Sequence, residues 1–202
     1  MEATENDQYF FNFSFFKIDP KWRWMADLAK EESAKEVENV IINSGIKFRS
    51  YSTLGLRDDA EFLFWFAAET VEEIQNVISK LYLTVFGKYI IPSRVYLSCT
   101  RPSTYARKGT LSSFVLGNEP QKFVIVYPFT KTREWYLLPQ AQRQKLMDQH
   151  INVSEKYPQV TLNTTYSFGI GDQDFMLAFE CDDLRDFQNL IMDLRPVSYT
   201  HL

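Results

Sequence analysis

The chain has 202 residues, of which 45% are hydrophobic, 16% aromatic and 24% charged, and its formal net charge is −4. This balance is that of a globular protein with a large aromatic core, and it excludes an intrinsically disordered chain. Because the chain carries no general excess of positive charge, we expect no nucleic-acid partner.

Two further features bear on where the protein works. No apolar run is long enough to span a bilayer, and the first seven residues are polar and acidic, unlike a secretory signal. Cys99 and Cys181 have neither metal-binding nor CxxC spacing, so we interpret them as buried reduced thiols. We therefore expect a cytoplasmic protein without a membrane span.

The first half of the chain predicts four strands and two helices. Phe11, Phe13 and Phe15 alternate with polar residues, as in a strand. Thr70 and Glu73 are spaced as a capping box at the start of a helix. These signals predict the order βαββαβ of a ferredoxin-like unit. The expected elements are strands at 9–18, 47–56, 61–68 and 94–100, a helix at 27–44 and a helix that begins after Thr70.

The second half predicts a similar order that ends one strand early. An apolar run indicates its first strand, Pro139 suits the first turn of a helix, and Asp183 is placed to cap a later helix. The expected elements are strands at 122–129, 160–170 and 174–180, a helix at 139–157 and a helix that begins after Asp183.

Two segments fall outside these elements. Residues 102–121 are rich in Ser, Gly and Pro and predict a linker, either a solvated loop or an anion-binding lid that carries Arg107 and Lys108 and directly follows Arg101. The last residues, 198–202, have no counterpart in the first half, and we interpret them as a truncated or foreign tail.

The two halves repeat one another. Residues 66–81 read FAAETVEEIQNVISKL and residues 179–194 read FECDDLRDFQNLIMDL, at a separation of 113 positions. Such a repeat indicates duplicated structural units. The sequence therefore predicts an α+β protein of two fused ferredoxin-like repeats with antiparallel sheets. The expected domains are 8–101, the linker 102–121, and 122–197. A residue that one half has and the other lacks is a candidate for function.

His150 is the first such difference, because the first half contains no histidine. A lone histidine on an apolar helix face is more often a core residue than a ligand. A neutral imidazole in an apolar pocket is nevertheless the commonest axial ligand of haem iron. Both interpretations stay open on the residues alone. The residues that share its predicted helix face are Leu146, Met147, Val153 and Tyr157.

The strand that opens the second half is the other difference. It reads VIVYPFTK where the first half has FSFFK, so Tyr127 and Lys131 stand out. Tyr127 is either a core residue or a redox-active phenol beside a cofactor, and the pair Trp135-Tyr136 follows before the predicted histidine helix.

Signatures of other chemistries are absent from the sequence. It contains no GxGxxG, GxxxxGK[ST], HExxH or GxSxG motif. The acidic turns at 58–59 and 172–174 occupy the same place in the two copies, which favours a structural hairpin role over a metal site.

Residues 127–150, YPFTKTREWYLLPQAQRQKLMDQH, resemble the segment of the chlorite dismutase and coproheme decarboxylase family that leads to the proximal haem histidine. Residues 169–195 are similar to the hairpin and helix that follow it in the family. The stretches KIDPKWRW and YSTLGLRDDAEFLFW resemble its haem-free N-terminal repeat. The resemblance covers nearly the whole chain and is greatest to archaeal and environmental members. It implies a dimeric α+β barrel and a homo-oligomer, often a pentamer.

The resemblance also implies a haem pocket in the second half. His150 matches the proximal iron ligand, and Tyr127 matches the tyrosine whose radical oxidises a propionate in coproheme decarboxylases. Lys131 matches a propionate-anchoring lysine, and Trp135 matches a tryptophan that lines the haem. The implied cofactor is haem b or coproheme, and the implied co-substrate is hydrogen peroxide.

Two positions depart from the family pattern. The distal position falls at Asn163 or its neighbour Leu162, where chlorite dismutases have an arginine that steers the oxychlorine anion. No arginine lies between Asn152 and Gln173, so chlorite dismutation is disfavoured. Coproheme decarboxylases carry Gln or His there, and Asn163 is a shorter amide. An acidic partner of the proximal histidine is also missing, since Ser198 stands roughly at its place.

The expected function is peroxide-dependent oxidative decarboxylation of iron coproporphyrin III to haem b, a step of haem biosynthesis. The first alternative is a haem-binding protein with only peroxidase activity or a sensor or carrier role. The second is a haem-free α+β barrel used for assembly.

Overall fold

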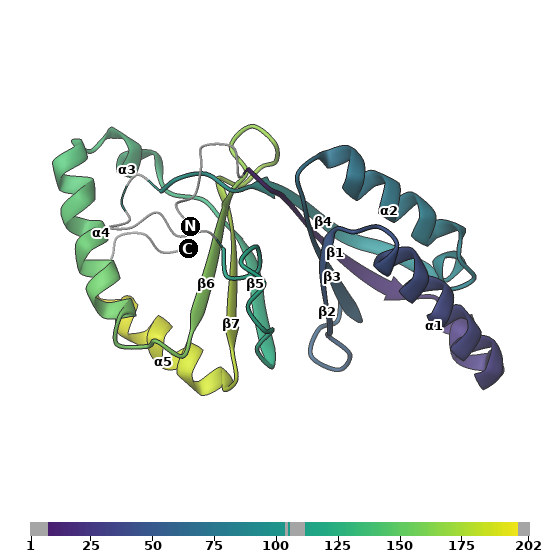
Figure 1. Ribbon diagram of the computed structural model, residues 1–202. Helices are drawn as coiled ribbons and strands as arrows, with labels where there is room; N and C mark the ends of the chain where they lie inside the picture. The colour runs from purple at the N-terminus through teal and green to yellow at the C-terminus, as the bar shows by residue number, and fades with distance from the viewer. Residues whose placement is uncertain (1–7, 104, 106–111, 198–202) are drawn as a thin grey trace. The chain divides into compact units, whose positions relative to one another are not determined.

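The structure is a computed structural model that describes residues 8–103, 105 and 112–197 (Figure 1). The chain divides between Cys99 and Thr100 into two compact units, the N-terminal unit and the C-terminal unit. Arg107, Lys108, Ser198 and the expected tail lie outside the described residues. Within the described part, no helix has the length and apolar character needed to cross a membrane.

The N-terminal unit is an antiparallel sheet with two helices on one face (Figure 1). Its strands lie in the order β2-β3-β1-β4. The helices bury an aromatic core that includes Phe16, Phe64 and Phe66. The elements are β1 (Phe10–Ile18), the 3-10 helix η1 (Pro20–Trp24), α1 (Asp27–Ile42), β2 (Lys47–Ser52), β3 (Phe62–Ala68), α2 (Val71–Leu83), the 3-10 helix η2 (Phe86–Lys88) and β4 (Ile90–Cys99).

One local prediction for this unit is confirmed and two boundaries are corrected. Thr70 and Glu73 form the expected capping box at the start of α2. β2 ends earlier than expected, before a turn in which Gly55 has a φ of 74°. β4 starts earlier, at Ile90, because its pairing with β1 continues past Pro92 to Ile90. The register shifts next to Pro92, and such an irregularity accommodates a proline in a strand.

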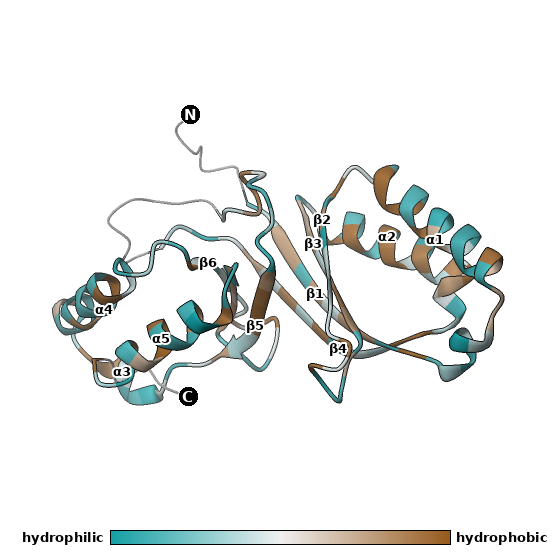
Figure 2. Ribbon diagram, turned by 90° about the horizontal axis from the view of Figure 1, so that it is seen from below, coloured by the Kyte–Doolittle hydropathy of each residue, from teal (hydrophilic) through white to brown (hydrophobic). Residues whose placement is uncertain are grey.

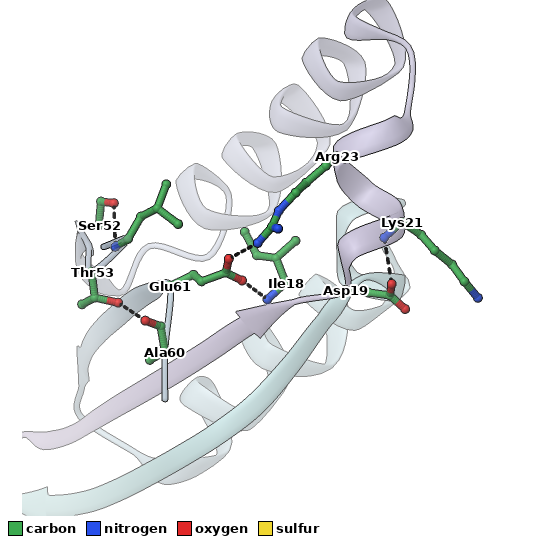
Figure 3. Close-up of polar contacts among 9 residues, drawn as sticks. Ile18, Asp19, Lys21, Arg23, Ser52, Thr53, Ala60 and Glu61 are labelled. Carbon is green, nitrogen blue, oxygen red and sulfur yellow. Dashed lines mark hydrogen bonds and ion pairs between the residues drawn. The ribbon is translucent and has the colours of Figure 1, made fainter. Parts of the chain in front are cut away.

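Glu61 joins the end of β1 to the 3-10 helix that follows it (Figure 3). Its Oε2 accepts a hydrogen bond of 2.6 Å from the Ile18 backbone N–H. Its Oε1 accepts one of 2.6 Å from the Arg23 guanidinium. The helix η1 itself begins where the Asp19 carboxylate accepts from the Lys21 backbone N–H. These contacts fix the direction in which the chain continues from the end of β1 into η1.

The C-terminal unit is also antiparallel, with its strands in the order β6-β7-β5. α4 and α5 lie on the same side of these strands (Figure 1). No strand follows α5 in the part of this unit that the structure describes. The expectation of an α+β protein with antiparallel strands is therefore confirmed. The elements are β5 (Phe123–Phe129), α3 (Arg133–Leu137), α4 (Gln140–Ser154), β6 (Thr161–Tyr166), β7 (Phe175–Cys181) and α5 (Leu184–Leu194).

Two features of the C-terminal unit were not expected from the sequence. The first is the short helix α3, which Thr132 caps by accepting from the Trp135 backbone N–H. The second is the packing of residues 112–117, within the expected linker, where Phe114 is 4% exposed. Hydrogen bonds to a buried side chain of β6 hold this stretch in place, as described below.

Candidate functional site

The inner face of α4 is the first part of the candidate site. Met147 Sδ lies 3.5 Å from the Lys131 amine, while Val153 and Tyr157 pack against a core cluster of Phe179, Leu190 and Leu194. His150 stands one turn after Met147 and one turn before Val153, so it shares this face. Its ring is half-buried, and its Nδ1 atom is shielded from solvent.

The expectation that His150 lies on a buried helix face is met only in part. No residue of α4 is fully buried, and Figure 2 shows α4 with mixed hydrophilic and apolar turns, whereas β5 is mostly apolar. The residues on the inner face of α4, His150 among them, therefore keep part of their surface exposed.

Lys131 occupies an apolar corner between β5 and α3. Its Nζ lies 3.7 Å from the centroid of the Trp135 ring and 5.7 Å from that of Tyr105. Burial, together with the nearby positive charge of Arg143, lowers the pKa of Lys131 from 10.5 to about 8. Asp174 opposes this fall only weakly. The amine is therefore a cation held in surroundings that disfavour its charge.

Asp174 links the backbone at Lys131 to the helix α3 that follows it. Its Oδ2 accepts a hydrogen bond of 3.0 Å from the Lys131 backbone N–H and one of 2.7 Å from the Tyr136 hydroxyl. Burial and this second bond raise the pKa of Tyr136. The turn at 172–174 is thus part of a hairpin, as expected, and it also ties that hairpin to α3. Sequence spacing gave no signal for this contact.

Tyr127 lies on the face of the sheet that α4 and α5 cover. Its ring stacks on Phe179 at 5.9 Å between centroids and packs against the same core cluster as Val153. Burial raises the pKa of the Tyr127 phenol, and Arg195 opposes this rise. The phenol therefore stays protonated at neutral pH.

The strand β6 separates the two candidates for the distal position. Leu162 pairs with Phe179, whereas Asn163 pairs with Ala178. Because directly opposed residues of paired strands point to the same face, Leu162 lies on the face of Tyr127 and Phe179, and Asn163 lies on the other. The structure therefore brings Leu162, and not Asn163, to the side of the sheet that the helices cover.

The Asn163 side chain is occupied by hydrogen bonds. It is 1% exposed, and its Oδ1 accepts from the hydroxyls of Ser112 and Ser113, the latter at 2.9 Å. Its Nδ2 donates to Glu180 Oε2 at 3.1 Å. Asn163 thus holds residues 112–114 against the sheet. Sequence analysis also missed Thr164, which pairs with Leu177 and so shares the face of Leu162.

A metal ion at His150 would depend on donors from outside the protein. No group of three or more His, Cys, Asp or Glu residues in the described ranges is arranged to hold a metal. A single imidazole is the donor set that suits an axial ligand to a metal already held in a macrocycle. His150, the cation Lys131 and the aromatic wall of Trp135 together fit an iron porphyrin that bears carboxylates.

A sequence model described as Chlorite dismutase matches residues 29–201. The chain belongs to the chlorite dismutase family. The resemblance drawn from the sequence is thereby confirmed, and this is a family of haem enzymes.

Individual relatives agree with this assignment. The coproheme decarboxylase of Mycolicibacterium smegmatis is 35% identical over 146 residues, which are 72% of this chain and 63% of that relative. The chain thus spans less than two thirds of the length of this curated relative.

Solved structures show the same fold. The chlorite dismutase of Candidatus Nitrospira defluvii in complex with imidazole is 28% identical and superposes with a TM-score of 0.85, covering 96% of this chain and 84% of that one. A mutant of the same enzyme in complex with cyanide is 27% identical, has a TM-score of 0.85 and gives the same coverage.

Proposed function

We propose that the C-terminal unit binds iron coproporphyrin III and converts it to haem b by peroxide-dependent oxidative decarboxylation. The observation that carries the proposal is the position of the Lys131 amine. It lies against the Trp135 ring and contacts Met147, which is one helical turn before His150. The curated relative named as a coproheme decarboxylase supports the choice of reaction.

His150 would bind the iron through a ring nitrogen, and Lys131 would hold a propionate. The iron porphyrin would supply the redox chemistry. Each propionate that becomes a vinyl group loses CO2, a proton and two electrons, and hydrogen peroxide accepts the electrons. Tyr127 lies on the helix-covered face, where its partly buried phenol would lose an electron together with its Oη proton. Trp135, only 4% exposed, would form the wall beside the porphyrin and exclude water there.

The direct test supplies the purified full chain with iron coproporphyrin III and hydrogen peroxide and follows the products by chromatography. We expect a three-propionate intermediate and then haem b, and we expect Tyr127→Phe to abolish both while porphyrin binding survives. Tyr157→Phe is the matched control, because Tyr157 packs against the same cluster but donates its hydroxyl to Asp193. A wild-type protein that makes no vinyl product would contradict the proposal.

The iron ligand has a separate test. In His150→Ala, the Soret shift that accompanies haem or coproheme binding to the wild type should be lost. An unchanged shift in the variant would instead indicate that the iron is bound elsewhere.

The second candidate is a haem-binding protein with peroxidase activity or a carrier role. One observation favours the carrier role: of the two positions expected for the distal residue, the one on the helix-covered face is the apolar Leu162, which offers no hydrogen bond to bound peroxide. Peroxidase turnover that persists without any decarboxylated product would select this candidate over the first.

The family also supports a proposal about assembly. We expect a cytoplasmic homo-oligomer, a pentamer by resemblance, in which the sheets contribute to a dimeric α+β barrel. Light scattering on the full chain, with and without porphyrin, gives the mass that checks it.

A further inference from the structure

Arg143 is a second cation beside the candidate site, and neither the sequence analysis nor the proposed chemistry uses it. It lies on α4, one turn before Met147 and two turns before His150. Its Nε atom is buried and has no hydrogen-bond partner among the described residues. A buried guanidinium donor left unpaired is costly, and such groups are rare in folded proteins.

Arg143 is also close to Lys131. The charge of Arg143 contributes to the low pKa of Lys131, second only to burial. The contact between Lys131 Nζ and Met147 Sδ, at 3.5 Å, places the amine against the next turn of the same helix. Two like charges therefore share one partly buried corner.

The nearby carboxylate does not bridge these two cations. Asp174 Oδ2 accepts from the Lys131 backbone N–H and the Tyr136 hydroxyl, and so it is directed to the backbone side of Lys131. Two neighbouring cations, one with a buried unpaired N–H, are complementary to a carboxylate supplied by a ligand.

We propose that Arg143 and Lys131 together bind one carboxylate of the porphyrin, with Arg143 Nε donating a hydrogen bond to it, and that Arg143 sets the preference for porphyrins with a free carboxylate at this edge. The inference rests on the proposed function, because it takes the ligand to be a porphyrin. It adds a residue that distinguishes a charged carboxylate from its neutral ester.

Equilibrium binding tests the inference without turnover. The probes are metal-free coproporphyrin III and its tetramethyl ester, each titrated with the protein and followed by porphyrin fluorescence. The variants are Arg143→Ala and Arg143→Lys. The control is Lys145→Ala, which removes an exposed positive charge from the same helix.

We expect Arg143→Ala to weaken binding of coproporphyrin III by about 10- to 100-fold, the usual effect of removing a charge-assisted hydrogen bond. Binding of the tetramethyl ester should stay unchanged. The affinity of Arg143→Lys for coproporphyrin III should lie between those of the wild type and Arg143→Ala. The affinity of Lys145→Ala should equal that of the wild type. The Lys131 amine should also titrate at higher pH in Arg143→Ala, which modification by an amine-reactive reagent across pH measures.

Three results would overturn the inference. If Arg143→Ala binds coproporphyrin III as tightly as the wild type, Arg143 has no role at the carboxylate, although the proposed function stands. If Arg143→Ala weakens the binding of coproporphyrin III and of its tetramethyl ester equally, the substitution acts through packing and not through charge. If the wild type binds neither porphyrin, the proposed function fails as well.

Discussion

Replacing Lys131 by methionine should make the ligand-free protein more stable while weakening porphyrin binding. Each pKa unit corresponds to ~1.36 kcal/mol, so a fall of the Lys131 pKa from 10.5 to about 8 places roughly 3 kcal/mol of cost on the folded charged form. Because Lys131 is only partly buried, solvent screening reduces this to about 1–2 kcal/mol. Methionine keeps the contact with the Trp135 ring and removes the charge.

The assay is urea unfolding of the wild type and Lys131→Met at neutral pH, with a gain of about 1–2 kcal/mol expected, or roughly 2–8 °C in Tm. The control is Lys122→Met, since Lys122 is exposed and lies over the Phe123 ring at 5.1 Å. Its stability should change by less than about 0.5 kcal/mol.

The pH dependence identifies the cause of the gain. Below pH 8, Lys131 is charged in both the folded and the unfolded chain, so the full cost is present. Between about 8 and 10.5 the unfolded chain binds more protons than the folded one, so wild-type stability rises with pH. The advantage of Lys131→Met should therefore shrink across this window. A variant that is less stable at pH 7, or an advantage that does not change with pH, would refute the reasoning.

Three further predictions follow from the site and its supports. A bound carboxylate raises the pKa of Lys131, so affinity for coproporphyrin III should be constant between about pH 6 and pH 8, where the carboxylates and the amine are both charged. Above pH 8 it should fall by up to about tenfold per pH unit, as measured by fluorescence titration. Asn163→Ala should lower the free energy of unfolding by about 2–3 kcal/mol, because it removes the buried hydrogen bonds of the Asn163 side chain to Ser113 and Glu180. Leu162→Ala should change stability little but shift the Soret band of bound haem. The opposite pattern would mean that Asn163 faces the porphyrin. Thr70→Ala should cost about 1 kcal/mol in urea unfolding through loss of the α2 cap, and should leave porphyrin affinity unaltered.

Local sequence signals by themselves determined the repeat and most of the helices and strands, α3 excepted. The alternating phenylalanines, the capping box at Thr70 and the proline before α4 act over a few residues, so their effect does not wait for tertiary contacts. The repeat between residues 66–81 and 179–194 predicted two similar units in the same way. The helical period also placed Met147 and Val153 on one face with His150.

Only the tertiary structure decided which side chains meet. Strand residues alternate between faces, so a change of one position in register exchanges Leu162 for Asn163, and that register depends on pairing with β7. The neighbouring charges of Lys131 and Arg143 depend on how the chain turns through α3 between β5 and α4. These are contacts between elements that pack together only after folding, and no spacing along the chain encodes them.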